Sequence, residues 1–148
     1  MRPIPTPHII NVALLLLILS CLLGVKAHAE DQDPDFILVI NTQDKELTLS
    51  KQQIRHIFMG GSLSNKFKAV NLPSGNQLRI EFNTKIVGLT ESRIQAYWAQ
   101  MKFTGRSKPP MELETPQKAL EYLVKTESAI TYLPSDIEIP DGLTIIYP

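Results

Sequence analysis

The sequence predicts an α/β fold with a mostly parallel sheet of about four strands and crossover helices. Short apolar runs typical of buried strands alternate with amphipathic segments typical of helices. The first apolar run, Phe36–Ile40 (FILVI), is continuous, which suits a strand covered on both faces of a parallel sheet. Strands that are separated by helices imply right-handed crossover connections.

The element boundaries follow from capping and turn residues. Ser50 with Gln53 forms a capping box, and Thr115 followed by Pro116 is a strong helix start. Gly88 is expected to end the second helix. The predicted strands are 36–40, 67–72, 129–133 and 143–147, and the predicted helices are 50–58, 77–87, 90–101 and 116–124. Residues 103–110 and the acidic pair Glu112 and Glu114 are expected in a solvated loop.

The first 29 residues have the layout of a secretory signal peptide. An aliphatic run of about 14 residues, Val12–Val25, precedes the small-x-small motif Ala27–Ala29. That run is shorter than the roughly 20 residues of a membrane-spanning helix. We therefore expect cleavage after Ala29 and a single periplasmic domain over residues 30–148. An uncleaved anchor is the alternative, and a lipoprotein signal at Cys21 is disfavoured by the bulky Leu19 and Leu22.

The composition left after cleavage excludes several classes of function. Cys21 is the only cysteine, so no disulfide or thiol chemistry remains. Removing Arg2 and Lys26 from the 15 basic residues leaves 13 against 15 acidic ones, which argues against nucleic acid as a partner. The remaining His56 lies off the apolar face of its predicted helix, and no catalytic or metal-binding motif is present. We therefore expect a non-enzymatic protein without a cofactor or metal.

One segment has the features of an anion site. In parallel sheets, ligands bind beyond the carboxyl ends of the strands, which points to the turn Pro73–Gln77 and to Asn41–Thr42. A helix beginning at this turn would offer free N–H groups to an anion. Ser74 and Asn76 add side-chain donors, and Arg79 adds a positive charge. Ser, Gly and Asn are also ordinary helix-capping residues, so the pattern has a purely structural reading as well.

Several segments, in their order and spacing, resemble the phosphate-binding proteins of ABC transporters. Ser50–Gly60 (SKQQIRHIFMG) is similar to a conserved helical segment of that family, and Ala129–Leu133 (AITYL) to its "a-I-G-Y-v" strand. The turn Pro73–Asn76 stands where the family has its Gly-Ser-Gly-Thr phosphate loop. Tyr97–Trp98 and Phe103–Gly105 are similar to a short branch with one lobe. The resemblance implies a single lobe of the type 2 periplasmic-binding-protein fold.

The chain differs from the phosphate-binding proteins of this family at two positions. Leu72 stands near the position of the family's arginine before the loop, and Thr131 replaces the glycine of the strand. The resemblance implies ligand contacts from Ser74, Gly75, Asn76 and Gln77, with Arg79 supplying the charge that Leu72 lacks.

Two hypotheses follow. The first is an exported solute-binding module with phosphate or another small oxyanion as its candidate ligand, serving phosphate uptake or sensing. The alternative is a protein-interaction lobe that regulates a membrane sensor or transporter without binding a small ligand. In that case the exposed members of a group of three aromatic residues and one methionine would be anchors. That group is Tyr97, Trp98, Met101 and Phe103. The helical spacing of these residues also suits core packing. The sequence leaves the oligomeric state open, a dimer included, and Arg106 and Lys108 are expected to be solvated.

Overall fold

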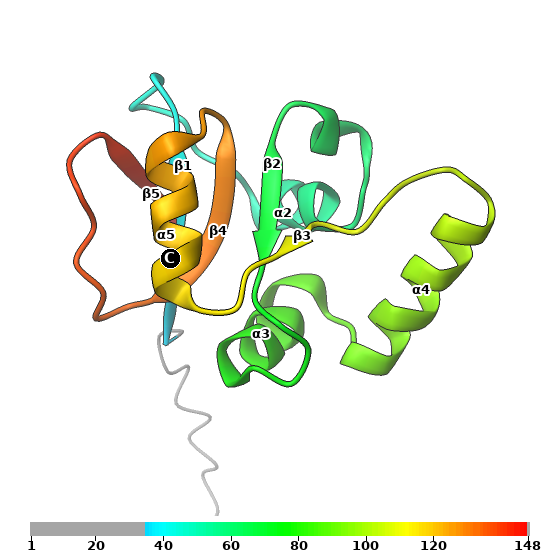
Figure 1. Ribbon diagram of the computed structural model, residues 1–148. Coiled ribbons are helices and arrows are strands. Elements are labelled where there is room, and N and C mark those ends of the chain that lie inside the picture. Colours follow the sequence, from blue (N-terminus) through cyan, green and yellow to red (C-terminus); the bar gives the residue numbers. More distant parts are fainter. Residues whose placement is uncertain (1–34, 148) are drawn as a thin grey trace, which may run out of the picture. The chain divides into compact units, whose positions relative to one another are not determined.

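Within residues 35–147, which the computed structural model describes, five strands form one sheet (Figure 1). The strands are β1 (Phe36–Asn41), β2 (Lys68–Asn71), β3 (Met111–Glu112), β4 (Ala129–Pro134) and β5 (Leu143–Tyr147). Their order across the sheet is β3-β2-β4-β1-β5, so the first strand of the chain lies between the last two. The sheet therefore joins the two ends of the described sequence.

The strand directions correct the expectation of a mostly parallel, four-stranded sheet. β2 pairs in parallel with β3 and β4, but β1 is antiparallel to both β4 and β5, so the sheet is mixed. The continuous apolar run of β1 indicates burial on both faces, which is correct, but burial does not specify strand direction. The fifth strand, β3, has only two residues and lies in a segment expected to be a loop.

The helices begin where the capping residues predict. They are α2 (Lys51–Phe58), α3 (Gln77–Phe82), α4 (Glu91–Phe103) and α5 (Pro116–Lys125), with a 3₁₀ turn η1 (Ser62–Asn65) and a π-helical turn η2 (Asn83–Val87). The capping box of Ser50 and Gln53 is present, and Thr115 accepts a hydrogen bond from the Lys118 N–H. The predicted single helix 77–87 instead changes to π geometry at Asn83 and ends at Gly88, whose φ is 70°.

Helices cover both faces of the sheet. On one face α5 packs against β1, β2 and β4 through a cluster of small and aliphatic side chains (Figure 1). On the other face α2, α3, η2 and α4 enclose a larger cluster with an aromatic centre. Phe82 of α3 stacks on Tyr132 of β4 with ring centroids 4.2 Å apart, and Phe36 and Phe58 pack around this pair. This second layer fixes α3, and with it the loop that precedes α3.

Different residues lie at the two ends of the strands in this sheet. β2 and β3 run in parallel, so their carboxyl ends meet, and Asn71, the following loop and Glu112 lie there together. Asn41 lies at the opposite end of the strands, because β1 runs in the other direction. There the Asn41 carbonyl accepts a hydrogen bond from the N–H of Ser128, which precedes β4. Asn41 also donates to the Leu123 carbonyl at the end of α5. The expectation that Asn41–Thr42 lie at the same end of the sheet as the Pro73–Gln77 turn is therefore wrong.

The predicted signal peptide over residues 1–29 and the domain start at residue 30 lie outside the described residues, so both stay predictions. In the part that is described, none of the helices has the length and apolar character needed to cross a bilayer.

Candidate functional site

The loop after β2 caps its own helix. Asn76 is the N-cap of α3, and its Oδ1 accepts hydrogen bonds from the N–H groups of Leu78 (3.0 Å) and Arg79 (3.4 Å). The Asn76 N–H donates to the Pro73 carbonyl at 3.1 Å. Gly75 has a φ of 87° and faces open space. The capping prediction for this loop is confirmed, and it means that part of the donor set at this helix start is already satisfied.

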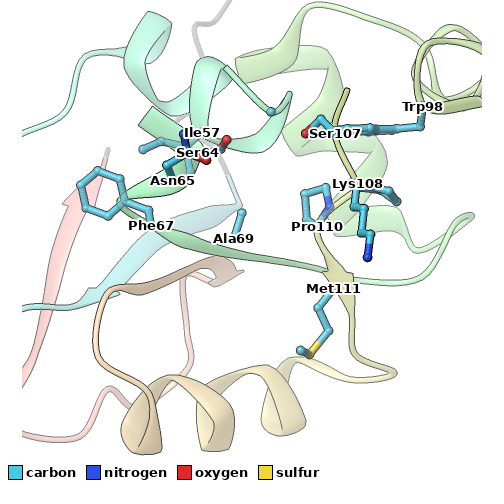
Figure 2. A pocket seen from close by; sticks show the side chains of 12 residues that line it. Ile57, Ser64, Asn65, Phe67, Ala69, Trp98, Ser107, Lys108, Pro110 and Met111 are labelled. Carbon is cyan, nitrogen blue, oxygen red and sulfur yellow. The ribbon is translucent and has the colours of Figure 1, made fainter. Parts of the chain in front are cut away.

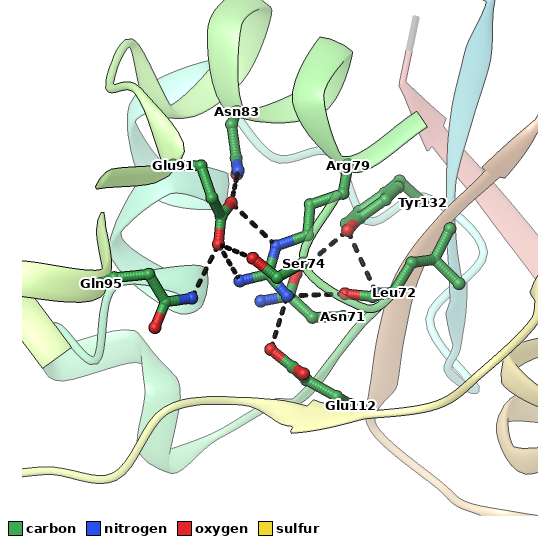
Figure 3. Close-up of polar contacts among 9 residues, drawn as sticks. All are labelled: Asn71, Leu72, Ser74, Arg79, Asn83, Glu91, Gln95, Glu112 and Tyr132. Carbon is green, nitrogen blue, oxygen red and sulfur yellow. Dashed lines mark hydrogen bonds and ion pairs between the residues drawn. The ribbon is translucent and has the colours of Figure 1, made fainter. Parts of the chain in front are cut away.

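Arg79 is the most deeply buried charged side chain among the described residues, with 2% of its surface exposed. Its Nε and Nη2 donate to the two carboxylate oxygens of Glu91 at 3.1 and 2.8 Å (Figure 3). Its Nη1 donates to Glu112 Oε1 at 2.5 Å and to the Leu72 carbonyl at 2.6 Å. The guanidinium is thus held between two carboxylates, one from α4 and one from β3.

Glu91 is the centre of this network. Besides the two bonds from Arg79, it accepts hydrogen bonds from Ser74 Oγ (2.8 Å), Asn83 Nδ2 (2.8 Å) and Gln95 Nε2 (2.7 Å). It is also the first residue of α4, where the helix dipole favours a negative charge. Burial raises the pKa of Glu91, but the hydrogen bonds from Gln95 and Ser74 and the charge of Arg79 outweigh it, so the pKa lies below its usual value.

Tyr132 links this network to the centre of the sheet. Its hydroxyl donates to Asn71 Oδ1 at 3.3 Å and accepts from the Leu72 N–H at 3.2 Å. Burial raises the pKa of the Tyr132 phenol, so the hydroxyl stays protonated and acts as this donor. The end of β2, the guanidinium and the aromatic core are therefore held as one unit.

A cavity of about 240 Å³ opens beside the guanidinium. It is lined by Asn71, Arg79, Gln95, Trp98, Ala99, Lys102, Pro109 and Glu112. Lys102 forms no ion pair with any residue between 35 and 147. Glu112 has 47% of its side chain exposed, against 24% for Glu91. The cavity therefore combines two cations and two amides with one carboxylate that is half in solvent.

The structure brings together only some of the predicted site residues. Ser74 and Arg79 meet at Glu91, while Asn76 serves the helix start. Gly75 and Gln77 are exposed, and the Gln77 side chain has no hydrogen bond within the described range. The assignment of all five residues to a ligand stays a prediction.

The sequence reasoning missed the counter-ions. Glu112 is not simply solvated as expected, since it pairs with Arg79, and the ion pair between Glu91 and Arg79 was not predicted. One available signal was the spacing of Arg79 from Phe82 and Asn83, which places all three on one helix face. Phe82 and Asn83 are both buried, as Arg79 is.

Comparison with known proteins supports the fold. The structure is similar to the crystal structure of an ABC-type phosphate transport receptor from Vibrio cholerae, with a TM-score of 0.54 and 12% sequence identity. The similarity covers 76% of this chain and 45% of that receptor, so the chain spans less than half of the receptor's length. No family model and no curated protein matches the sequence. The chain thus has an α/β fold similar to part of that receptor.

The described part of the chain contains no cluster of three or more His, Cys, Asp or Glu side chains that could hold a metal ion. The cavity beside Arg79 offers hydrogen bonding and ion pairing, with Arg79, Lys102 and the amides of Asn71 and Gln95 as donors.

Proposed function

We propose that the protein is an exported, non-enzymatic solute-binding lobe, with phosphate or another small oxyanion as its candidate ligand, serving phosphate uptake or sensing. The observation that supports this most directly is the cavity in which Arg79 and Lys102 lie beside the amides of Asn71 and Gln95. This cavity lies at the carboxyl ends of β2 and β3, and ligands of open α/β sheets bind beyond such strand ends. The similarity to a phosphate transport receptor supports the same class of role.

In this proposal the oxyanion takes the place of Glu112 on Arg79. Glu91 is held by five hydrogen bonds from four side chains and remains the fixed counter-ion. Glu112 is half exposed, so its carboxylate returns to water at little cost when it leaves Nη1. The arriving anion then gains a charge-assisted hydrogen bond from a buried guanidinium and the charge of Lys102. Ser74, Gly75, Asn76 and Gln77 stay the predicted contacts on the loop side, outside the set of residues that line this cavity.

This exchange predicts that Glu112 competes with the ligand. We expect Glu112→Gln to raise the affinity for phosphate or sulfate at least tenfold in calorimetric titrations, since the competing charge is removed. Glu114→Gln is the matched control, because Glu114 is a neighbouring carboxylate that pairs with Lys118 and not with Arg79. Acetate serves as a third anion that separates oxyanions of phosphorus and sulfur from carboxylates.

The proposal fails if neither the parent protein nor the Glu112→Gln variant releases or absorbs heat with millimolar phosphate, sulfate or acetate. It also fails if Glu112→Gln and Glu114→Gln change the affinity equally, because the effect would then be one of net charge.

The export part of the proposal rests on residues 1–29. It predicts that the protein isolated from the periplasm begins at Glu30, which N-terminal sequencing can check. A chain that retains its first residues and sediments with membranes would instead support the uncleaved anchor.

The second candidate function, a protein-interaction lobe, has one supporting observation. Phe103 at the end of α4 has 94% of its surface exposed, whereas Trp98 on the same helix is buried. Exposed aromatic side chains are frequent anchors of interfaces. If this function holds, a stoichiometric partner crosslinked in native membranes should be lost with Phe103→Ser and retained with Arg106→Gln. Crosslinking that is insensitive to Phe103→Ser would exclude this surface as the anchor.

A further inference from the structure

Charge is distributed unevenly along the chain. Residues 51–110 contain ten Lys or Arg and two Asp or Glu, whereas residues 111–147 contain two Lys or Arg and seven Asp or Glu. Both acids of the basic segment are paired within it, with Arg79 and Lys85. Its eight other cations are all exposed and form no ion pair with any described residue. Their charge is therefore available to an anionic partner.

The fold separates these two groups of charges in space. The basic segment supplies α2, α3 and α4, which cover one face of the sheet, and the acidic segment supplies α5 on the other face (Figure 1). A charge asymmetry of this kind within one chain is typical of proteins that bind an anionic surface. We therefore expect the side of the domain that carries α4 to face such a surface.

The C-terminal end of α4 combines this charge with an exposed aromatic ring. Phe103 has 94% of its surface exposed, more than any other large apolar side chain of the described chain. Three exposed cations lie within five positions of it, namely Lys102, Arg106 and Lys108. Residues 92–111 contain no Asp or Glu. We call residues 102–108 the α4 tip.

The backbone holds the Phe103 ring in this exposed position. The Arg106 N–H donates to the Met101 carbonyl, and the Gly105 N–H donates to the Lys102 carbonyl, both at 3.1 Å. Gly105 has a φ of 66°, so α4 ends in a Schellman motif. Phe103 is the last residue of the helix and projects from an ordered turn rather than from a loose loop. Little conformational freedom is lost when such a side chain binds.

Both sides of the tip are fixed to the rest of the domain. Before it, Trp98 is buried, and the Tyr97 hydroxyl donates to the Met59 carbonyl at 2.7 Å. After it, Ser107 lines the same cavity of about 280 Å³ as Trp98. Figure 2 shows the Lys108 side chain directed away from Trp98. The tip is therefore a supported projection with its ring and its cations in solvent.

A phenyl ring among unpaired cations matches the interface of an anionic bilayer. Aromatic rings lie at the boundary between headgroups and acyl chains, and Lys and Arg pair with the lipid phosphates above it. Stable attachment requires both contributions, and the tip has both. The five unpaired cations outside the tip are spread over the other elements of the basic segment, which favours an extended anionic surface over one pocket of a protein.

We propose that the α4 tip docks on an anionic lipid bilayer, with the Phe103 ring in the interface and with Arg106 and Lys108 beside the lipid phosphates. The docking surface is separate from the proposed oxyanion site and does not depend on it. Lys102 lines the cavity beside Arg79, so the tests below leave Lys102 unchanged.

Cosedimentation of the full protein with vesicles measures this contact. Binding to phosphatidylcholine vesicles that contain about 30% phosphatidylglycerol should be at least tenfold tighter than binding to pure phosphatidylcholine. Phe103→Ser should weaken binding at least tenfold, because the buried area of a phenyl ring is lost. Arg106→Gln and Lys108→Gln should each weaken it about fivefold.

The matched controls lie on α5. Val124→Ser removes an exposed apolar side chain and Lys125→Gln an exposed cation, so both should leave the affinity unchanged. All variants share residues 1–34, so any effect of that segment cancels in the comparison. Phe103→Trp adds an exposed indole to a chain whose single tryptophan, Trp98, is buried. Its emission should shift to shorter wavelength with phosphatidylglycerol vesicles and stay constant with pure phosphatidylcholine.

Four results would overturn the inference. They are no binding to phosphatidylglycerol vesicles, equal binding of Phe103→Ser and Val124→Ser, equal binding of Arg106→Gln and Lys125→Gln, and unchanged emission of Phe103→Trp. Retention on native membranes without binding to vesicles would also overturn it, in favour of a protein partner. Release by millimolar phosphate at constant ionic strength would place the lipid headgroup in the cavity beside Arg79 and so exclude docking through the tip.

Discussion

Replacing Glu91 by Gln tests whether the buried guanidinium depends on one carboxylate. The change keeps the size of the side chain but removes its charge, so Arg79 retains only Glu112 as a counter-ion. It also replaces one of the two oxygens that receive hydrogen bonds from Arg79, Asn83, Ser74 and Gln95. Arg79 and Asn83 are both more than nine-tenths buried, so solvent compensates little of this loss.

The expected cost follows from these contacts. Breaking a buried ion pair by removing one partner costs about 3–5 kcal/mol. Glu91 is itself 24% exposed, which places the expected loss near the lower end, at about 3 kcal/mol. That is a large part of the roughly 5–15 kcal/mol that separates folded from unfolded domains. Glu112→Gln acts on the same guanidinium, but Glu112 is 47% exposed, so its loss should cost no more than about 1 kcal/mol.

Urea unfolding followed by circular dichroism measures both values by linear extrapolation. The reasoning requires that Glu91→Gln costs at least about 2 kcal/mol more than Glu112→Gln, at an unchanged dependence on urea. Equal costs for the two variants would refute the assignment of Glu91 as the structural counter-ion and of Glu112 as the exchangeable one.

Three further predictions concern pH and backbone geometry. The pKa of Glu91 in the folded protein is lowered from 4.5, so ionised Glu91 stabilises the fold above about pH 4.5. This stabilisation is lost as the pH falls through the pKa that Glu91 has in the folded state. The stability of Glu91→Gln, measured by urea unfolding at several pH values, should lack this loss at acidic pH. Ser128 has a φ of 62°, and Ser128→Gly should raise the free energy of unfolding by about 0.5–1 kcal/mol, whereas a lower value would show that the serine is not strained. Thr115→Ala removes the cap of α5 and should cost about 1 kcal/mol, and Thr126→Ala, which has no capping side-chain bond, should cost far less. Urea unfolding measures both of these changes, and equal effects of the two threonine variants would contradict the capping assignment.

Local chemistry explains which parts of the fold could be read from the sequence. The capping box at Ser50 and the Thr115–Pro116 start are decided within four residues, and both are present. The direction of β1 is decided by β4 and β5, which follow it only after most of the domain. β3 has no pattern of its own, because its two residues become a strand only by pairing with β2.

The same distinction applies to the site. The sequence singled out Arg79 as the charge of the loop, and the burial of that side chain follows from its place on the face of α3 that carries Phe82. A buried guanidinium requires counter-charges, but the two that it finds are 12 and 33 positions away in the chain. Nothing in the spacing of Glu91 and Glu112 marks them as partners, since α4 and β3 are brought together only by the folded sheet.

The central place of β1 has a consequence for when the protein can fold. β1 is synthesised first, but its hydrogen-bonding partners begin about 90 residues later, at β4 and β5. Both of its edges, with five consecutive apolar side chains, therefore stay open until β4 and β5 have been synthesised. The sheet consequently cannot close around β1 before both of these strands are present, and a version shortened before β5 would leave one edge of β1 available for aggregation.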